Sequence, residues 1–448
     1  MNDILSGART TIRVERDVCY GEAAIGHRTN TPGLRALLMD VFLPPGVAPA
    51  DGRPALVLSH GGAYHRGAKE RDEFEQDGSH NTPVHEYCER FAARGYVCFS
   101  VGYRLTQELA PPQALPIKRN RQELHRGRID FVRELLGLPP ASPEELLHGV
   151  EGAWSDVASA FKFIHANAAR WSIDPERIAM GGFSAGGFAS AYAAYALGVP
   201  AAAIVCLSSG MDPEDADYYV HGGRGQPPVL LFSGEHDLPS IPGRVAALAS
   251  CAARAGLGMR SYLVPGKPHF YDREAPIVLQ QSTLPGGELC TTVETAIERF
   301  LAETLLPPQV DVDRLEAFAQ AWTRHDIDAL MSFMADDCVF HASAGPDASG
   351  TRYIGREAVR AGFVKAWTDF PDAQWTRARH FVQGVRGVSE WTFVGTRASD
   401  GQRVEVDGCD LFTFQGDKIR VKDSWRKMRT PGAQSEIRVE TGRPNLMR

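Results

Sequence analysis

The segment IAMGGFSAGG, residues 178–187, decides the fold of the first part of the chain. Its apolar start, residues 178–182, predicts a short buried strand, and a helix is expected over 186–198. Between them lies a pentapeptide of the form Gly-x-Ser-x-Gly, centred on Ser184. Its flanking glycines allow a sharp turn because they carry no Cβ that could clash. The segment therefore predicts a strand, a turn that exposes the Ser184 hydroxyl, and a helix whose amino terminus favours negative charge.

Strands and helices alternate on both sides of this segment. Strands are expected at 35–43, 55–60, 96–103, 201–208, 228–234 and 259–264, and helices at 84–94, 154–168, 243–255 and 291–303. This alternation is typical of a mostly parallel sheet with helices on both faces. Residues 1–305 are therefore expected to form one α/β domain.

A long segment, residues 105–150, interrupts the alternation and is rich in proline and arginine. Five of its basic residues lie close together, namely Lys118, Arg119, Arg121, Arg126 and Arg128. Long insertions in compact domains often form lids or binding loops, and a basic lid would suit a substrate that carries a carboxylate. A solvated surface insertion explains the charges equally well, so both interpretations stay open.

A domain boundary is expected at LLPPQ, residues 305–309, because the pattern changes there. Helices are expected at 313–324, 327–334 and 356–369, and strands at 338–341, 373–384, 388–396, 403–414 and 418–429. Helices followed by a run of strands predict an α+β domain with an antiparallel sheet, here residues 311–430. The polar residues 431–448 are expected to form a tail.

Two residues downstream of Ser184 complete a candidate catalytic set. A serine hydroxyl needs a base to become nucleophilic, and the base needs an orienting carboxylate. Asp237 and His269 each follow an expected strand, so they lie at the same edge of the sheet as Ser184. Their order along the chain, Ser, Asp, His, is the order found with Gly-x-Ser-x-Gly turns. Glu235 and His236 are the alternatives for the acid and the base.

The oxyanion of a tetrahedral intermediate requires N–H donors. One is expected from Ala185, which follows the nucleophile, and others from the loop after an early strand. The segment SHGGAY, residues 59–64, provides that loop. We expect Gly62 and Ala63 to donate, and His60 to organise the loop rather than act as a base.

Four segments resemble the HGG-type esterases, a group that includes hormone-sensitive-lipase-like carboxylesterases, feruloyl-esterase-like proteins and relatives of kynurenine formamidase. They are HGGA (60–63), GFSAGG (182–187), GEHD (234–237) and PHF (268–270). The resemblance covers residues 35–303 and implies an α/β-hydrolase fold, no cofactor, and hydrolysis of an ester or sometimes an amide. Ala63 replaces the third glycine of the HGGG pattern but still offers an N–H. The 105–150 insertion is longer than the usual connection, which leaves the substrate class open.

The second domain resembles the SnoaL-like branch of the nuclear-transport-factor-2-like superfamily. The matching segments are AQAWTRHD (319–326), YIGREAV (353–359) and DLFTFQGDKI (410–419). The resemblance implies a cone in which three helices pack on a curved sheet around a pocket. Such domains are often dimeric, and we expect a homodimer.

Strand alternation points to one pocket residue in this domain. In the strand expected at 403–414, Asp410 shares a face with apolar residues such as Val406 and Phe412. A carboxylate there is costly unless it is paired or protonated, and isolation would raise its pKa. His341 and Trp425 are expected to line the same pocket. The resemblance implies acid–base work for a pocket aspartate in cyclases and isomerases, whereas a hydrogen-bonded structural carboxylate is the interpretation we favour.

Composition excludes several classes of function. The net charge of −7 and the pI of about 6.1 give no basic patch for nucleic acid or for an anionic membrane. No apolar run reaches the 18 or so residues of a membrane span, and the first residues do not resemble a signal peptide. Eight cysteines without a CxxC pair indicate reduced thiols and a cytoplasmic protein. No metal or cofactor is expected.

The favoured hypothesis is a serine hydrolase that cleaves a small carboxylic ester or lactone through Ser184, His269 and Asp237. An amidase with the same triad remains possible in principle. A bifunctional enzyme, whose second domain isomerises or cyclises a related intermediate, is a further alternative. A non-catalytic binding protein is disfavoured because the Ser–Asp–His order is complete. The acyl and alcohol groups do not follow from the fold.

Overall fold

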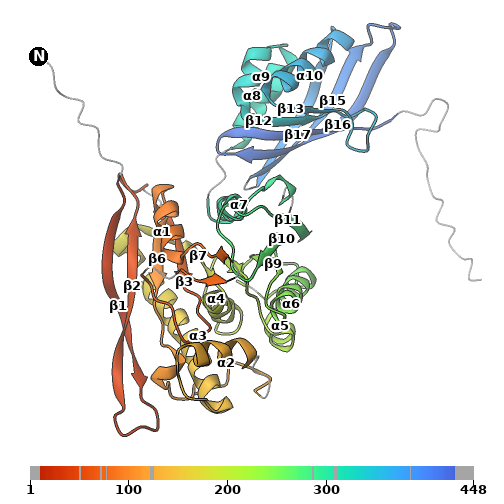
Figure 1. Cartoon of the computed structure of the whole chain (residues 1–448). Helices are drawn as coiled ribbons and strands as arrows, with labels where there is room; N and C mark the ends of the chain where they lie inside the picture. The colour runs from red at the N-terminus through yellow and green to blue at the C-terminus, as the bar shows by residue number, and fades with distance from the viewer. Residues whose placement is uncertain are drawn as a thin grey trace, which may run out of the picture. The chain divides into compact units, whose positions relative to one another are not determined.

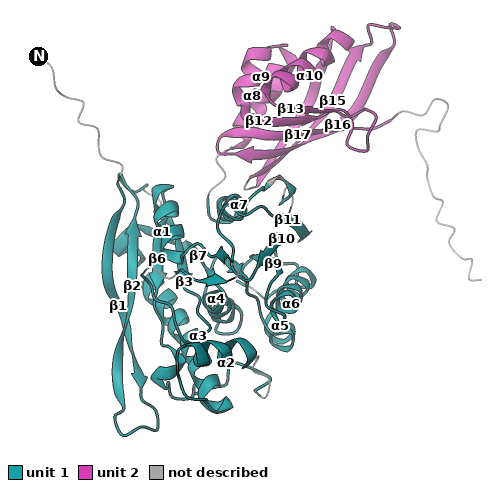
Figure 2. Ribbon diagram, in the orientation of Figure 1, with its two compact units in different colours: residues 1–306 teal, residues 307–448 magenta. Residues whose placement is uncertain are grey.

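The computed structural model describes residues 11–49, 52–70, 73–76, 78–121, 126–223, 225–284, 287–306, 310–383 and 385–428. The predicted polar tail, 431–448, and part of the predicted boundary, 307–309, lie outside the described residues. The chain divides into two compact units, residues 1–306 and 307–448 (Figure 2). Each unit is described by itself.

Unit 1 is built on a mixed sheet that is mostly parallel. Its nine strands within the described residues are β1 Arg13–Ile25, β2 Gly33–Leu43, β3 Arg53–Ser59, β6 Val97–Val101, β7 Ile173–Phe183, β8 Ala203–Leu207, β9 Val229–His236, β10 Met259–Pro268 and β11 Val278–Ser282. They run in the order β1-β2-β6-β3-β7-β8-β9-β10-β11. The strands from β6 to β10 are parallel, and β1, β2 and β11 add antiparallel edges. The predicted α/β-hydrolase fold is confirmed (Figure 1).

Helices cover both faces of this sheet (Figure 1). They are α1 Val84–Ala93, α2 Arg126–Leu135, α3 Pro143–Ala166, α4 Ala185–Tyr195, α5 Pro213–Tyr219, α6 Ile241–Arg254 and α7 Val293–Leu305. Side chains of β3 alternate between two cores, with Val57 in the core under α3, α4 and α6 and Leu58 in the core under α1 and α7. A strand buried on both faces has no polar side, which explains its continuous apolar run.

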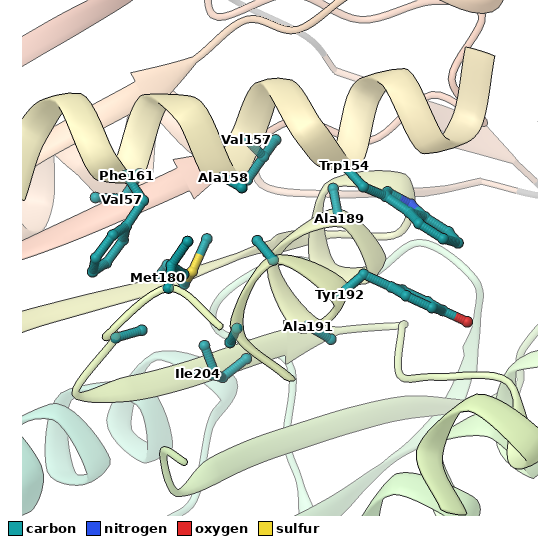
Figure 3. Close-up of a cluster of buried hydrophobic side chains, with 14 of the residues drawn as sticks. Val57, Trp154, Val157, Ala158, Phe161, Met180, Ala189, Ala191, Tyr192 and Ile204 are labelled. Carbon is teal, nitrogen blue, oxygen red and sulfur yellow. The ribbon is translucent and has the colours of Figure 1, made fainter. Parts of the chain in front are cut away.

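The helix α3 begins at Pro143, well before the predicted start at residue 154. Ser142 caps it, because the Ser142 side chain accepts from the backbone N–H of Glu145. Farther along, Trp154 stacks on Tyr192 of α4, with ring centroids 3.6 Å apart and an interplanar angle of 9° (Figure 3). The insertion therefore ends inside a helix that belongs to the core.

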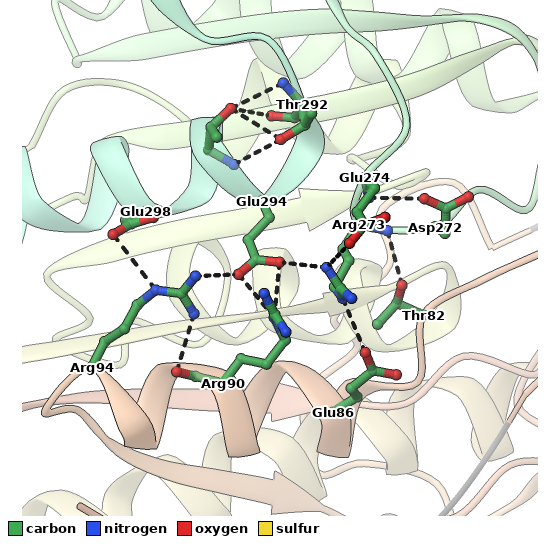
Figure 4. A network of polar contacts seen from close by, with 11 residues as sticks. Thr82, Glu86, Arg90, Arg94, Asp272, Arg273, Glu274, Thr292, Glu294 and Glu298 are labelled. Carbon is green, nitrogen blue, oxygen red and sulfur yellow. Dashed lines mark hydrogen bonds and ion pairs between the residues drawn. The ribbon is translucent and has the colours of Figure 1, made fainter. Parts of the chain in front are cut away.

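An ion-pair network joins α1 and α7, the two helices on the opposite face of the sheet from α3 and α4 (Figure 4). Glu294 at the start of α7 is buried and accepts hydrogen bonds from Arg90 of α1, from Arg94 directly after α1 and from Arg273. The Arg90 Nε lies 2.9 Å from each carboxylate oxygen. One carboxylate thus holds three guanidinium groups between α1 and α7.

Unit 2 has three helices against a six-stranded sheet within the described residues. The helices are α8 Val312–Thr323, α9 Ile327–Phe333 and α10 Arg356–Asp369, and the strands are β12 Met334–His341, β13 Arg352–Ile354, β14 Gln374–Gln383, β15 Arg386–Thr396, β16 Arg403–Gln415 and β17 Lys418–Arg426. The strand order is β13-β12-β17-β16-β15-β14. The predicted α+β architecture is confirmed. The sheet is not wholly antiparallel, because β12 and β17 pair in parallel.

Candidate active site

Ser184 lies on a strained turn between β7 and α4. Its backbone has φ 49° and ψ −117°, a conformation that costs a non-glycine residue free energy. The glycines on either side are needed because β3 passes close by. A Cβ on Gly186 would lie 2.0 Å from the Ser59 carbonyl oxygen, and one on Gly182 would lie 2.3 Å from it. Contact with β3 therefore fixes the turn that presents Ser184.

His269 connects Ser184 to Asp237. The His269 Nε2 lies 2.9 Å from the Ser184 Oγ, and its Nδ1 lies 2.6 Å from the Asp237 Oδ1. The side chains of His269 and Asp237 are both buried. The structure thus brings together the three residues that the sequence singled out, in the geometry of a nucleophile, a base and an orienting carboxylate.

The Asp237 carboxylate is itself held by other groups. It accepts from the backbone N–H of Gly234 at 3.0 Å and of Leu238 at 2.7 Å. The Ser208 Oγ lies 2.7 Å from the Asp237 Oδ2 and 3.1 Å from the Tyr271 hydroxyl. Sequence reasoning missed Ser208, although it directly follows β8, whose end neighbours that of β7 in the sheet.

The alternative acid and base lie elsewhere. Glu235 is exposed and accepts from the backbone N–H of Gly266 at 2.7 Å. His236 is also exposed. The geometry therefore favours Asp237 and His269 over these two neighbours.

The loop after β3 has the strained backbone expected of an oxyanion loop. Gly62 has φ 111°, and Ala63 and Tyr64 also have positive φ, at 53° and 62°. A Cβ on Gly62 would lie 2.0 Å from the Arg66 carbonyl oxygen. Within the described part of the chain, no hydrogen bond uses the backbone N–H of Gly62 or Ala63. Ala185 begins α4, and the first N–H groups of a helix have no intrahelical acceptor.

His60 lies within the loop but away from the serine's hydrogen-bond chain. Its ring stacks on Tyr103 with centroids 4.2 Å apart, and its Nδ1 lies 2.8 Å from the Gly61 carbonyl oxygen. Burial lowers the pKa of His60 to about 4, so the ring is neutral near pH 7. These contacts suit a residue that organises the loop.

A cavity of about 90 Å³ opens beside Ser184. Aromatic side chains form one wall, where the Trp154 Nε1 donates to the Tyr64 hydroxyl at 2.8 Å and Tyr192 stacks on Trp154. Four residues of the 105–150 insertion line the cavity: Lys118, Arg128, Ile129 and Val150. The insertion therefore helps to form the cavity wall.

The cationic side chains at this cavity differ in their partners. Lys118 is buried and pairs with Asp212, which also pairs with Arg244. Burial works to raise the pKa of Asp212, but Arg244 and Lys118 outweigh it and hold the pKa below its usual range. Lys118 and Asp212 are thus a compensated pair in the cavity wall.

Arg128, which lines the cavity, and Arg66, which does not, have no such carboxylate among the described residues. Among the described residues neither forms an ion pair, and Arg128 donates to the neutral Gln76 side chain at 3.2 Å. The Arg66 Nε is buried without a hydrogen-bond partner. Burial lowers the pKa of both groups, and the charge of Arg66 lowers that of Arg128 further. Arg66 stacks on Phe74, and Arg128 lies 5.7 Å from the ring of Phe270.

Unit 2 contains a second cavity, of about 290 Å³, and corrects part of the sequence prediction. Asp410 is buried, as predicted, and is hydrogen-bonded, which agrees with the favoured interpretation, but it does not line this cavity. It accepts from the Lys422 Nζ at 2.6 Å, the Ser424 Oγ at 2.6 Å and the Trp391 Nε1 at 3.0 Å. His341 is not among the lining residues and lies 3.9 Å from Asp423.

Trp425 is 55% exposed and lines a different hollow, with Cys409 and Arg379. Alternation along β17 explains the error, because Trp425 and its neighbour Ser424 point to opposite faces, whereas Arg426 lines both hollows. The sequence reasoning also missed Lys422, the residue that neutralises Asp410.

The described residues show neither a metal site nor a membrane span. No cluster of three or more His, Cys, Asp or Glu side chains has the arrangement of a metal site there. None of the described helices is long and apolar enough to cross a membrane. All eight cysteines are free thiols.

Comparison with known proteins finds similarities for both units. Residues 149–203 match the model of the BD-FAE family, which comprises esterase-type α/β-hydrolases, and residues 315–421 match the model of the SnoaL-like domain. A thermophilic esterase from the Planctomycetes species Thermogutta terrifontis is 18% identical over 66% of this chain and 96% of its own, with a TM-score of 0.41. A protein assigned as a polyketide cyclase from Xanthomonas campestris is 21% identical over 25% of this chain and 87% of its own, with a TM-score of 0.23. The family matches confirm both resemblances seen in the sequence.

Proposed function

For a chain that combines a BD-FAE-type hydrolase unit with a SnoaL-like unit, we propose hydrolysis of a carboxylic ester or lactone at Ser184. The observation that carries the proposal is the hydrogen-bonded chain Ser184–His269–Asp237 beside an open cavity. The strained turn at Ser184 supports it, because strain at a surface serine is retained where the hydroxyl must be presented to a ligand.

The proposed reaction proceeds through an acyl-enzyme. His269 takes the proton of Ser184 as the Oγ attacks the carbonyl carbon, and Asp237 stabilises the imidazolium that forms. The N–H groups of Gly62, Ala63 and Ala185 stabilise the oxyanion. Collapse of the intermediate breaks the C–O bond, and His269 returns the proton to the leaving alcohol. Water then attacks the acyl group by the same path and releases the acid.

The cationic side chains at the cavity support a substrate that bears a negative charge near the reacting bond. Arg128 lines the cavity, and Arg66 follows the oxyanion loop. The charge of Arg66 disfavours the protonated form of Arg128, an effect that a substrate carboxylate accepting from a guanidinium would offset. The proposed substrate is therefore an acidic ester or lactone.

Intact-mass analysis after treatment with a fluorophosphonate tests the proposal. We expect one adduct on the wild-type protein and none on Ser184→Ala, with a matched control, Ser100→Ala, labelled as the wild type. Ser100 is a buried serine whose hydroxyl donates to the Lys69 carbonyl oxygen. Folded wild-type protein without an adduct, or with an adduct that survives Ser184→Ala, would refute the role of Ser184.

A further inference from the structure

The cavity of unit 2 is lined by aromatic rings and, among the described residues, by one cation that forms no ion pair. Its aromatic lining consists of Trp322, Phe340, Tyr353, Phe370, Trp375 and Trp391. The charged lining residues are Lys365, Asp369, Lys422 and Arg426. Lys365 pairs with Asp369 at 2.9 Å, and Lys422 pairs with Asp410. Arg426 forms no ion pair with any described residue.

Arg426 is held by apolar contacts rather than by an anion. Its guanidinium lies 4.3 Å from the ring centroid of Phe393 and 5.8 Å from that of Trp391. Its Nε is buried and has no hydrogen-bond partner in the described part of the chain. Burial lowers the pKa of Arg426, while the charge of Asp410 works to raise it. A partly buried cation without an ion-pair partner among the described residues is unfavourable, so its retention points to a ligand.

The unsatisfied polar atoms of unit 2 share one property. Those recorded among its described residues are the Arg426 Nε and the indole nitrogens of Trp322 and Trp367. All three are N–H groups, which donate and cannot accept. Two of the three residues, Arg426 and Trp322, line the cavity. A ligand that satisfies them must supply acceptor oxygens.

We propose that this cavity binds a small aromatic carboxylate, with the acid group on Arg426 and the flat body among the aromatic rings. The cation is matched by the carboxylate charge, and the guanidinium fork fits its two oxygens. The aromatic walls suit a planar apolar body. The Lys422–Asp410 pair is already neutral, so Arg426 determines the preferred charge. The proposal concerns unit 2 and does not depend on Ser184.

Calorimetric titration of the full chain with matched ligands tests the proposal. The probes are benzoate and 2-naphthoate, with benzamide and 2-naphthamide as neutral partners of the same shape. We expect at least one carboxylate to bind at least 10-fold more tightly than its amide, since a hydrogen bond to a charged group is worth roughly that factor or more. Arg426→Gln should remove the preference. Arg420→Gln, on the same strand but paired with Asp337, should retain it.

Two further measurements make the test decisive. Arg128→Gln should leave the affinity unchanged, which separates this site from the cavity beside Ser184. The melting temperature of Arg426→Gln without ligand should equal or exceed that of the wild type, because a partly buried cation without an ion pair among the described residues is removed. The proposal is wrong if neither carboxylate binds at millimolar concentration, if the amides bind equally well, if Arg426→Gln retains the preference, or if Arg128→Gln abolishes binding.

Discussion

Replacement of Ser208 by alanine should slow the reaction of Ser184 with an electrophile, although Ser208 does not contact Ser184 in the hydrogen-bond chain. The Ser208 hydroxyl has one proton. Donation to Asp237 at 2.7 Å leaves it to accept from Tyr271 at 3.1 Å. Ser208→Ala therefore removes a donor from the carboxylate that orients His269, without changing the nucleophile or the base. Ser208 is in this sense a positioning residue.

The expected loss of rate in Ser208→Ala follows from the number of hydrogen-bond donors to Asp237. The carboxylate has four polar partners in the structure: Ser208, the Gly234 and Leu238 N–H groups, and His269. A hydrogen bond to a charged group contributes about 1.5–3 kcal/mol. Two backbone donors remain in the variant, so about 1–2 kcal/mol should be lost when the imidazolium forms. At about 1.4 kcal/mol per tenfold, this predicts a rate that is lower by roughly 5- to 30-fold.

The assay is the second-order rate constant of fluorophosphonate labelling, which needs no knowledge of the natural substrate. Ser100→Ala is the matched control, because it deletes a buried hydroxyl that donates to a neutral carbonyl. Melting temperatures of both variants separate loss of rate from loss of fold. A Ser208→Ala rate within twofold of the wild type, or an equal loss in Ser100→Ala, would show that Ser208 does not position Asp237.

Three further predictions concern single side chains. Burial works to raise the pKa of Glu294, but Arg90 and Arg94 outweigh it and lower the pKa. The ionised Glu294 therefore stabilises the fold above about pH 4.3. This stabilisation is lost as the pH falls through the lowered pKa. Glu294→Gln should therefore lower the free energy of unfolding by about 2 kcal/mol at pH 7 and by less at pH 3; equal losses by chemical denaturation at both pH values would contradict this. Gly62→Ala should reduce fluorophosphonate labelling by about 100-fold or more, because its Cβ would overlap the Arg66 carbonyl and displace the oxyanion loop; near-normal labelling would mean that this loop is not used. Arg128→Gln should raise KM for an acidic ester by about tenfold and leave a neutral ester of similar size unaffected, and parallel changes for both esters would refute an anionic substrate.

The residues around Ser184 were predictable because their signals are local. The turn can be recognised within a short stretch of sequence. Glycines lie two residues before and two residues after Ser184, with a strand before this motif and a helix after it. Asp237 and His269 followed from strand ends, since parallel strands bring their carboxyl ends to one edge. The structure shows why both glycines are needed, because Gly182 and Gly186 face the Ser59 carbonyl. The close passage of β3 is thus visible in the sequence only as the two glycines that it requires.

Elements whose pattern is broken by packing escaped prediction. The strand β1 was missed because register shifts after Glu15 and Cys19 interrupt its alternation. The start of α3 was missed because Gly149 and Gly152 weaken a helical pattern. In the structure a Cβ on Gly149 would lie 2.7 Å from the Thr106 Cγ2, so this glycine allows close contact rather than ending the helix.

Partners that are distant in sequence could not be assigned without the fold. Asp410 was correctly placed on the buried face of its strand, yet its neutralising Lys422 comes from the next strand, β17, through an antiparallel register that brings Ser424 opposite Asp410. The same register places Arg426 at the cavity and Trp425 away from it. A shift of one residue would exchange these faces. Sequence alone therefore identified the strand but not the charge balance of its cavity.

The cation in the cavity of unit 2 links the proposed hydrolysis at Ser184 with the proposed binding of a carboxylate at Arg426. The two proposals can nevertheless be tested separately. Hydrolysis of an ester or lactone releases a carboxylate, and among the described residues the cavity of unit 2 combines a guanidinium without an ion pair with N–H donors that have no acceptor. If unit 2 binds the acid product, or an acid of the same class, Arg426 would bind its carboxylate. A purely structural domain would give Arg426 no such role. If this link holds, Arg426→Gln should weaken binding of the aromatic carboxylate and leave the phosphonylation rate of Ser184 unchanged. Ser184→Ala should do the reverse, losing the adduct while retaining the affinity. A variant at either residue that disturbs both readouts would contradict two independent sites.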